Sequence, residues 1–376
     1  MRFPEFSGEW DRIKVSDLLE FYPTNSLSWE QLDYSGESIF NLHYGLIHKG
    51  LPTQVDVSEN NLPTIKDEYI PKKMSLCQNG DVAFADASED TNDVAKCIEF
   101  ANCDEQKIVC GLHTIHGRDT QNKTVTGYKG YVFSARPFRE QIRRLAQGTK
   151  IYSINSHNFS ECYIGIPCKE EQSNISNLLH TVDLRIATQI KIIEKLESLI
   201  KGLCQKLTQQ DNPNTALNDT LVCYSSTLQE SSVQETGDYP VYGATGVCGY
   251  TDTPEVDGDS ILIIKDGASV GVTYYASGRY SAIGTLNRLV AKRGYSLRYL
   301  YYCLKVFNFA PYRTGLAIPH IYFRDYGKAK VWCPSLDEQQ RIADALSKVE
   351  QKIAIEKSLL EQLYSQKRFL LQSMFI

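Results

Sequence analysis

Apolar residues recur every three or four positions in two long segments of the chain. They are Leu179, Val182, Ile186, Ile193, Leu196, Leu203 and Leu207 in the first segment, and Leu346, Val349, Ile353, Leu360, Leu363, Leu370 and Met374 in the second. This spacing predicts two long helices, each with a coiled-coil seam. Gln189 and Glu356 interrupt the seam at the same place, and a polar seam residue can fix register. The alternative is an amphipathic helix packed only on its own domain.

The two helical segments belong to a longer internal repeat. Residues 148–207 align without a gap with residues 315–374 after a shift of 167 positions, with 16 identities in 60 positions. Each copy opens on a glycine, Gly148 or Gly315, and has a Pro…Glu-Gln…Ile pattern where the helix begins. A repeat of this length predicts a chain that is approximately two-fold symmetric, in the order unit, helix, unit, helix.

The ends of the predicted helices can be located from the sequence. Acidic residues follow a proline at each start, where they complement the helix dipole, and the polar segment 209–214 ends the first helix. A continuous helix over 171–207 is about 55 Å long. We expect antiparallel packing of the two helices, in which Leu179, Val182, Ile186, Ile193 and Leu196 face Leu346, Val349, Ile353, Leu360 and Leu363.

The segments outside the helices are rich in predicted strands. Residues 82–85 and 260–265 are short apolar runs beside turn residues, and 270–275 is the expected hairpin partner of the second run. Residues 239–250 place aromatics between glycines and predict exposed loops, whereas 138–145 and 299–309 predict short helices. The fold class is α+β, with domains at 1–165 and 210–332 and spacer helices at 166–209 and 333–376.

Composition is that of a soluble globular protein, with 42% hydrophobic and 23% charged residues in 376. No apolar run is long enough to cross a membrane and no signal core opens the chain, so we expect a cytoplasmic protein. The 11 cysteines include no CxxC pair. The closest cluster, Cys97, Cys103 and Cys110, fits no standard zinc spacing, so we expect reduced, mostly buried thiols and no metal.

Charge is segregated along the chain, although the net charge is only −5. Residues 279–330 carry ten Lys or Arg and one acid (net +9), and residues 129–157 carry six and one (net +5). Residues 211–259 carry nine acids and no Lys or Arg. The two basic stretches flank the repeat at similar positions, which favours basic surfaces for nucleic acid. Chance clustering of solvated charge is the alternative.

The sequence contains no recognisable catalytic set. It has no GxxxxGK[ST] phosphate loop, and residues 265–271 read better as a hairpin turn than as a phosphate cradle. His113 and His116 near Asp119 suggest a metal site only weakly, because they lie in a polar stretch without helical pattern. No nucleophile, base and orienting residue are recognisable together. We therefore expect no catalysis from this chain alone.

The chain resembles the specificity (S) subunit of type I restriction–modification enzymes over essentially its whole length. The resemblance rests on the repeated Pro…Glu-Gln…Ile pattern and on short motifs at 44–48, 80–84, 111–115, 148–151, 239–243, 265–267 and 284–286. It implies that each domain is a target recognition domain reading half of a split DNA sequence, and that the helices set the unread gap.

The same resemblance implies the partners. These are double-stranded DNA, two methyltransferase (modification) subunits docked on the helices, and restriction subunits reached through the complex. S-adenosylmethionine and ATP are expected on those partners, with no cofactor in this chain and no membrane partner. Two other interpretations remain: a coiled-coil scaffold without a DNA role, and the specificity module of another restriction system type.

Candidate DNA contacts are polar, basic or aromatic residues in loops beside the basic stretches, because such side chains bind phosphates and base edges. In the first domain they are Tyr44, His48, His113, Thr114, Arg118, Lys150, Ser153 and Asn155. In the second they are Tyr242, Thr245, Lys265, Ser269, Thr285, Asn287, Arg313, Thr314, His320 and Tyr322.

Overall fold

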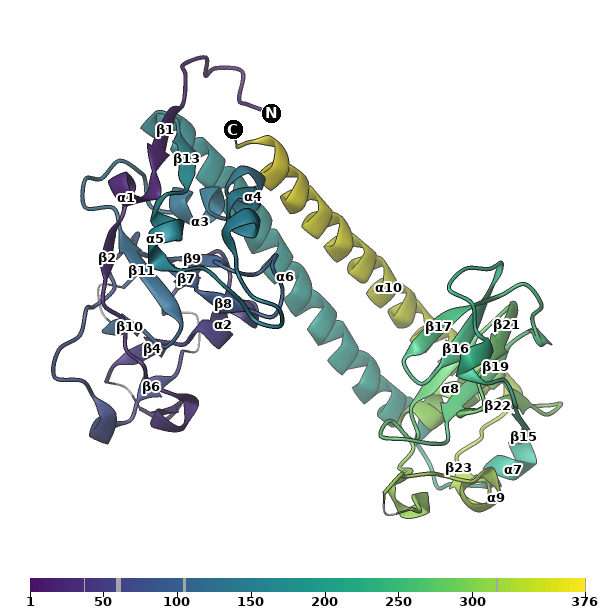
Figure 1. The fold of residues 1–376 in the computed structure, drawn as a ribbon. Coiled ribbons are helices and arrows are strands. Elements are labelled where there is room, and N and C mark those ends of the chain that lie inside the picture. The colour runs from purple at the N-terminus through teal and green to yellow at the C-terminus, as the bar shows by residue number, and fades with distance from the viewer. Residues whose placement is uncertain (37, 59–61, 104–105, 316, 376) are drawn as a thin grey trace. The chain divides into compact units, whose positions relative to one another are not determined.

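The computed structural model describes all residues except 37, 59–61, 104–105, 316 and 376. Two long helices, α6 (Lys169–Thr208) and α10 (Leu336–Ser373), dominate the fold (Figure 1). The chain forms two compact units, and each contains part of both helices. Unit 1 is Met1–Gln189 with Leu359–Ile376, and unit 2 is Ile190–Ser358. No helix in the described part of the chain is long and apolar enough to cross a membrane.

Unit 1 is built on two sheets with a shared core. The five-stranded sheet has the order β2 (Glu20–Tyr22), β11 (Thr114–Arg118), β7 (Val82–Ala85), β9 (Cys97–Ala101) and β5 (Gln54–Asp56). The four-stranded sheet has the order β10 (Ile108–Cys110), β4 (Phe40–Leu42), β6 (Thr64–Ile65) and β3 (Leu32–Asp33). Residues of both sheets, among them Phe100 and Leu42, share one buried apolar cluster. That shared cluster holds the two sheets together.

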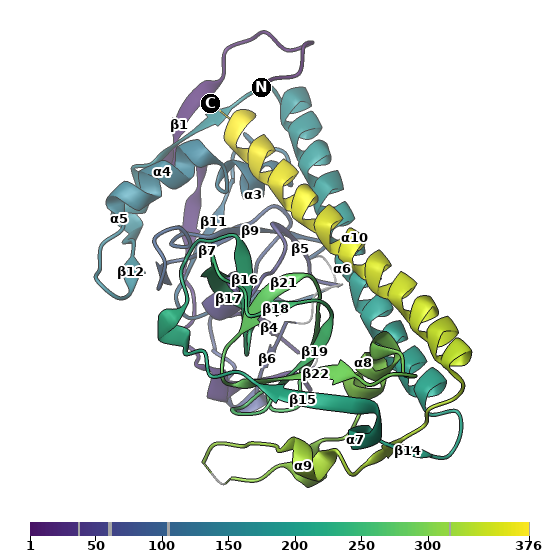
Figure 2. The same cartoon turned by 90° about the vertical axis from the view of Figure 1, so that its right-hand side faces the viewer.

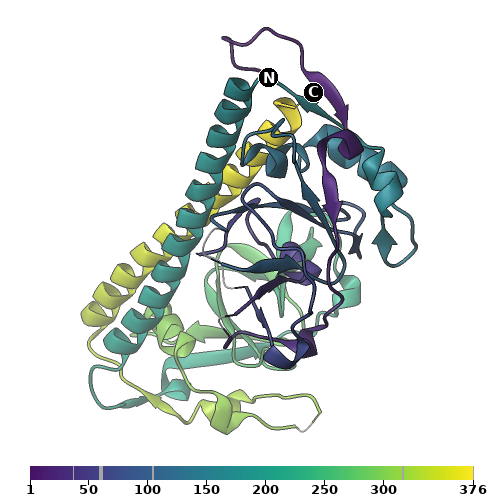
Figure 3. The same ribbon diagram turned by 90° about the vertical axis from the view of Figure 1, so that its left-hand side faces the viewer.

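Unit 1 also contains shorter elements that lie outside these two sheets (Figure 3). Strand β1 (Asp11–Lys14) pairs with β13 (Tyr163–Ile166), and β8 (Ala87–Ser88) pairs with β12 (Tyr152–Ser153). The helices are α1 (Val15–Leu18), α2 (Tyr44–His48), α3 (Tyr128–Val132), α4 (Arg136–Leu145) and α5 (Ser156–Ser160), with 3₁₀ turns η1 (Trp29–Gln31) and η2 (Asp67–Tyr69).

Unit 2 contains two four-stranded sheets (Figure 2). One has the order β15 (Leu221–Ser225), β22 (Leu286–Ala291), β19 (Ser260–Ile264) and β20 (Thr273–Ala276). The other has the order β17 (Gly246–Thr251), β16 (Tyr239–Gly243), β21 (Arg279–Ala282) and β18 (Val256–Asp257). The remaining elements are β14 (Thr215–Ala216), β23 (Lys330–Val331), α7 (Leu217–Thr220), η3 (Glu230–Ser232), α8 (Leu297–Lys305), η4 (Ala310–Tyr312) and α9 (Phe323–Tyr326).

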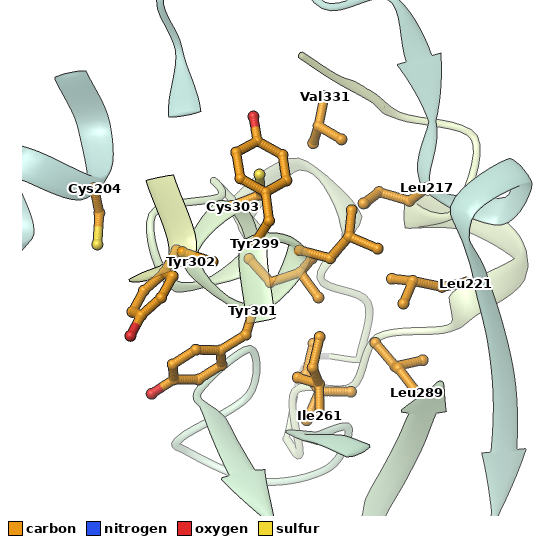
Figure 4. Close-up of a cluster of buried hydrophobic side chains, with 14 of the residues drawn as sticks. Cys204, Leu217, Leu221, Ile261, Leu289, Tyr299, Tyr301, Tyr302, Cys303 and Val331 are labelled. Atoms are coloured by element: carbon orange, nitrogen blue, oxygen red, sulfur yellow. The ribbon is translucent and has the colours of Figure 1, made fainter. Parts of the chain in front are cut away.

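Helix α8 joins the sheet of unit 2 to the long helices. Its Tyr299 and Tyr302 are fully buried, and they belong to one apolar cluster with Ile261 and Leu289 of the sheet and with Cys204 of α6 (Figure 4). A buried aromatic ring removes a large apolar area from water. The cluster therefore fixes the domain of unit 2 on the helices by packing.

A glutamine in the first turn of each long helix fastens the domain of its unit. The Gln172 carboxamide accepts from the Val125 backbone N–H (2.8 Å) and donates to Pro167 O (2.9 Å). Gln339 accepts from the Ser296 N–H (2.9 Å) and likewise donates to its preceding proline carbonyl (2.9 Å). Both side chains are almost completely buried. The glutamine of the repeated Pro…Glu-Gln…Ile pattern is therefore a structural clamp.

Two tyrosines repeat the same docking one turn apart. Tyr128 of α3 donates to Gly165 O (2.7 Å), as Tyr299 of α8 donates to Trp332 O (2.6 Å). Tyr131 then donates to Asp183 of α6 (2.9 Å). In the same way, Tyr302 of α8 donates to Glu350 of α10 (2.8 Å), the residue 167 positions after Asp183. The structural repeat thus extends to α3 and α8, beyond the aligned sequence.

The helices are antiparallel within each unit, as predicted. In unit 1, Asp183 pairs with Lys367 (2.6 Å), while the later residue Thr188 lines a groove with the earlier Leu359. In unit 2, Glu197 pairs with Lys357 (2.6 Å). The predicted seam residues are buried or half-buried, and Gln189 and Glu356 are buried among them.

The predicted facing sets are wrong in one respect. Leu346, Val349 and Ile353 share their cluster with Leu196, Ile200, Leu203, Cys204 and Leu207, at the end of α6. Antiparallel helices bring the start of one against the end of the other, so the sets had to be taken from opposite ends. Ile200 and Cys204 were missing from the predicted seam.

Other local predictions had mixed outcomes. Strand β7 and the turn at 265–271 between antiparallel β19 and β20 are confirmed. Residues 239–250 form the β16–β17 hairpin and not loops, because alternate side chains such as Val241 are buried in unit 2. The helix predicted over 299–309 ends at Lys305.

The Gln172 clamp predicts a stability loss that is confined to unit 1. Gln172→Leu leaves the Val125 N–H and the carbonyl groups of Pro167 and Lys123 without their partner, which should cost about 2–3 kcal/mol. Hydrogen exchange followed by mass spectrometry should show faster exchange in peptides of unit 1 and unchanged exchange in unit 2. Gln340→Leu, at an exposed position of α10, is the matched control. Equal protection in both variants would contradict the clamp.

A buried ion pair holds α3 in place and predicts a pH-dependent defect. Glu99 accepts from the N–H groups of Gly127 and Gly130 and pairs with Lys129 (3.2 Å), and both charged residues are buried. Burial raises the pKa of Glu99 despite these partners.

Lys129→Met should destabilise unit 1 by about 3 kcal/mol near neutral pH, because it leaves Glu99 without its counter-charge. The pKa of Glu99 should rise further in this variant. Protonation of Glu99 at mildly acidic pH should therefore remove the unpaired charge and reduce the loss of stability. Urea denaturation at the two pH values tests this, with the exposed Lys150→Met as control. A deficit that grows in acid would contradict the assignment.

Candidate nucleic-acid interface

Five aromatic rings form a continuous group at α2 of unit 1, here termed the aromatic cluster. It consists of Trp29, His43, Tyr44, His48 and His113. Ring centroids are 4.4 Å apart for Trp29 and His43, 4.7 Å for His43 and Tyr44, and 5.2 Å for Tyr44 and His113. His43 caps α2 by accepting from the Gly45 N–H through Nδ1 (3.2 Å). Burial lowers its pKa, which favours the neutral acceptor form.

The outer members of the aromatic cluster face solvent. Trp29 is 41% exposed, and the side chain of His113 is 51% exposed. His113 has φ +56°, so its turn lifts the ring out of strand geometry. Its Nδ1 is 3.1 Å from Asp86 Oδ1, and His48 Nε2 is 2.8 Å from Ala87 O. The cluster therefore presents flat rings and polar ring nitrogens on an anchored support.

A five-residue hairpin loop lies beside this cluster and recurs in unit 2. Ser153 pairs with Ala87 of β8 and, by two backbone hydrogen bonds, with Gln147. Thr314 and His320 are bridged by the same two bonds, and they are 167 positions after Gln147 and Ser153.

The first loop residue, Gly148 or Gly315, has positive φ in both hairpins. A side chain there would collide with the carbonyl oxygen of Ile151 or Ile318. Both isoleucines are exposed at the loops, by 64% and 65%. The glycine that opens each repeat copy is therefore required by a tight turn.

The other predicted contacts of this region are exposed around the hairpin of unit 1. Lys150 lies in its loop, and Asn155 caps α5 by accepting from the Asn158 N–H (2.7 Å). Ser153 is exposed as well. The structure thus brings Tyr44, His48, His113 and Ser153 together, with Lys150 and Asn155 adjacent along the chain.

In unit 2 the hairpin packs against the β19–β20 turn. Ile321 N donates to Lys265 O (2.9 Å), Gly267 N donates to Pro319 O (2.9 Å), and Arg313 Nη2 donates to Val270 O (3.1 Å). The fold brings together seven of the predicted contacts here: Lys265, Ser269, Thr285, Arg313, Thr314, His320 and Tyr322. Arg324 stacks over Tyr322 (4.7 Å) and adds a cation. We term this set the unit 2 loop cluster.

Tyr242 and Thr245 belong to the other sheet of unit 2. Thr245 is exposed in the turn of the β16–β17 hairpin, whereas Tyr242 is half-buried against Tyr280, with centroids 5.6 Å apart. Among the described residues, neither side chain forms a hydrogen bond, ion pair or ring contact with the unit 2 loop cluster.

Three predicted contacts have their side chains engaged inside the fold. Thr114 is buried and donates to Gly111 O (2.5 Å), and Asn287 is buried and accepts from Ser225 (3.1 Å). Arg118 forms a two-bond ion pair with buried Asp81 (2.7 Å each). These side chains lie on or beside strands, and the inward positions of a strand cannot be told from the outward ones in short segments.

Sequence reasoning missed two groups. Trp29 and His43 lie far in sequence from His113, and only the fold joins them. Arg136, Arg139 and Arg143 of α4 line a cavity of about 440 Å³ with Arg368 of α10. The basic stretch 129–157 indicated the three α4 arginines, but nothing local indicates that Arg368 joins them.

His113 and His116, which only weakly suggested a metal site in the sequence, bind different carboxylates. His113 faces Asp86, and His116 Nε2 is 2.8 Å from Asp81. The three cysteines closest in sequence, Cys97, Cys103 and Cys110, are all buried as expected, and the Sγ atom of Cys110 lies 3.6 Å from that of Cys77. All 11 cysteines are free thiols. Among the described residues, Cys77, Cys110 and His116 form a group able to hold a metal ion.

A family model described as the type I restriction modification DNA specificity domain matches residues 9–198 and 224–365. The chain belongs to this family. The two matched segments fall one after the other along the chain and cover most of it. Type I specificity domains therefore account for both repeat units.

Individual relatives agree with this family. The type I restriction enzyme EcoprrI specificity subunit of Escherichia coli is 26% identical over 110 residues, 29% of this chain, so the match spans only 27% of that relative's length. A type I restriction–modification S subunit from M. genitalium matches the structure with a TM-score of 0.61 at 17% sequence identity. The match covers 100% of this chain and 99% of that S subunit.

A structure from work on complex assembly and conformational transition of the type I system has a TM-score of 0.59 at 14% identity, covering 98% and 97%. At these low identities, the two solved structures show only that this chain shares their fold.

Proposed function

We propose that this chain is the DNA specificity subunit of a type I restriction–modification complex, in which each unit reads one half of a bipartite sequence. The observation that carries the proposal is the repeated presentation of polar loops. In both units the same glycine-opened hairpin lies beside aromatic and basic side chains. Membership in the DNA specificity family supports it. One frame that holds two different loop sets suits two different half-sites.

The chemistry of the two surfaces suits DNA. Arg313 is exposed and uses one guanidinium nitrogen on Val270 O, so the rest of its planar fork is available to a guanine edge or a phosphate. Exposed rings such as Trp29 and His113 offer flat contacts and hydrogen-bonding nitrogens. The cavity lined by the α4 arginines and Arg368 also contains Glu140, the ion-pair partner of Arg136, so its four arginines and one acid leave a net charge of +3 for the DNA backbone. We therefore assign base reading to the loops and phosphate binding to the arginine cavity.

The long helices are the proposed docking site for two methyltransferase subunits. In unit 1 an apolar groove of about 390 Å³ between α6 and α10 is lined by Leu184, Thr188, Leu359 and Leu363. A contiguous apolar surface of this kind is typical of protein interfaces. Restriction subunits would join through the complex. S-adenosylmethionine, ATP and all catalysis belong, in this proposal, to the partners, and the complex acts in the cytoplasm.

The specificity module of another restriction system type has the same expected DNA surface and differs only in its partners. A scaffold without a DNA role would leave the exposed loop residues without function. Co-purification of the chain with the methyltransferase encoded by a neighbouring gene distinguishes a type I specificity subunit from the specificity module of another restriction system type. DNA affinity that falls with salt separates both from the scaffold.

Two substitutions should weaken the half-sites independently. Arg313→Ala should weaken the half-site read by unit 2, and His113→Ala the half-site read by unit 1, so each is the control for the other. A lost base contact should cost roughly 1–3 kcal/mol at one base position, whereas a lost phosphate contact should weaken all sequences and reduce the salt slope by about one. Affinities for single-position site variants over a salt series, with methyltransferase present, measure both.

Wild-type affinity of both variants at every site would remove these two surfaces from the interface. Equal loss at both half-sites would show that the variants damage folding or assembly and not reading.

The helices should also act as a ruler for the unread gap. Since each unit holds part of both helices, four residues, about one turn, should be inserted in α6 after Gln189 and in α10 after Ser358. The gap between methylated half-sites should lengthen while both half-sites stay the same. Sequencing of methylated genomic sites measures this. An insertion in α6 alone is the control, because it shifts α6 against α10 and should reduce methylation. An unchanged gap in the double insertion would exclude the ruler.

A further inference from the structure

Three potential metal ligands meet inside unit 1, away from the exposed loops. The ligand atoms of Cys77, Cys110 and His116 all lie within 4.8 Å of one another. The two Sγ atoms are 3.6 Å apart, and all three residues are at most 5% exposed. The three residues come from three places: the segment before β7, the end of β10 and the middle of β11. Only the tertiary fold brings them together.

The imidazole of His116 has one nitrogen engaged by a carboxylate and one nitrogen available to a metal ion. Its Nε2 lies 2.8 Å from Asp81 Oδ2, and an ionised carboxylate can only accept, so Nε2 carries the proton. In the neutral imidazole, Nδ1 is then a buried lone pair, and it has no hydrogen-bond partner in the described part of the chain. A buried acceptor without a partner is costly. A carboxylate that fixes the far nitrogen of a histidine is the usual support of a metal-bound imidazole.

We propose that Cys77, Cys110 and His116 bind a zinc ion through their two sulfurs and Nδ1. Zn–S bonds of about 2.3 Å in a tetrahedral site place two sulfurs about 3.8 Å apart. The observed 3.6 Å is close to that value. It is far longer than the S–S bond of a disulfide, which is about 2.05 Å.

The charges at this site balance. Two thiolates neutralise Zn²⁺, and Asp81 is neutralised by the two-bond ion pair with Arg118. Burial would raise the pKa of Asp81, but hydrogen bonds from Arg118, His116 and Gln78 N outweigh burial and lower it. Arg118, proposed from sequence as a DNA contact, thus supports the zinc site. Cys77, Cys110 and His116 supply three ligands, and the fourth position of a tetrahedral site is left to water.

A metal ion at this site would restrain the segment that carries the aromatic cluster. Cys110 and His116 bracket the turn 111–113, which carries His113. They also lie in different sheets, since β10 belongs to the four-stranded and β11 to the five-stranded sheet. A metal ion would cross-link the sheets and fix this turn. Zinc binding itself is independent of the proposed function, whereas its effect on DNA reading rests on it.

Zinc content of the full chain tests the site directly. Protein purified with reductant and without chelator should contain about one zinc per chain by atomic spectroscopy. Cobalt substitution of the wild type should give the thiolate-to-metal charge-transfer absorption of a cysteine-bound ion. Cys110→Ser should lose both signals. Cys162→Ser, which alters another buried cysteine of unit 1, should keep them.

The proposal is overturned if the wild type contains no zinc and gives no thiolate–cobalt absorption. It is also overturned if Cys162→Ser loses the metal as fully as Cys110→Ser does, or if mass mapping without reductant finds Cys77 linked to Cys110. The cobalt measurement needs no variant, so misfolding of Cys110→Ser does not affect it.

DNA binding supplies a separate readout. Removal of zinc from the wild type with a chelator should lower affinity at least about tenfold for the half-site read by unit 1, comparable to loss of one good base contact, and leave the other half-site unchanged. Zinc binding without any DNA affinity would refute the proposed function and leave the metal site standing. DNA affinity in a protein that binds no zinc would refute the metal site and leave the proposed function standing.

Discussion

The buried carboxamide at the start of each long helix is the interaction on which the other features depend. Gln172 and Gln339 each bind a backbone N–H of the domain and the carbonyl of the preceding proline, in places where water cannot replace them. An unmade hydrogen bond costs more in such a place than a made one contributes. The carboxamide therefore fixes the direction in which the domain leaves its helix. Tyr128 and Tyr299 repeat the constraint on the next element.

A frame that is fixed by a few buried bonds leaves the loops free to differ. Both units keep the same glycine-opened hairpin, but they surround it with different chemistry. Unit 1 places stacked rings and histidines there, whereas unit 2 places Arg313, Tyr322 and Arg324. The zinc proposed for Cys77, Cys110 and His116 would add rigidity only to unit 1, where the turn that carries His113 joins two small sheets. Different supports can thus hold different reading surfaces on one repeated plan.

The two long helices carry equivalent carboxylates that are paired with lysines from different elements. Asp183 and Glu350 occupy equivalent places, and each accepts a hydrogen bond from a tyrosine hydroxyl of its domain. The lysines that form ion pairs with them, however, come from different helices. Lys367 comes from α10, at the place that Ile200 holds in the first copy, and Lys305 comes from α8. Both carboxylates are half-buried, so each is stabilised by a nearby positive charge, but that charge can come from either helix. The two halves of the repeat therefore differ where their surroundings differ.

The sequence by itself determined the repeat, the two long helices and their antiparallel pairing, because heptad spacing and helix-start signals are local and occur twice. It also located strand β7 and the turn after β19. Only the tertiary structure decided that Thr114 and Asn287 are buried, that Arg118 serves Asp81, and that the β16–β17 segment is a hairpin. It alone joined Trp29 to His113, Arg368 to the α4 arginines, and Cys77 to Cys110 and His116. The physical reason is that short strands carry too few residues to show which side is buried, and long-range contacts leave no periodic trace in the chain.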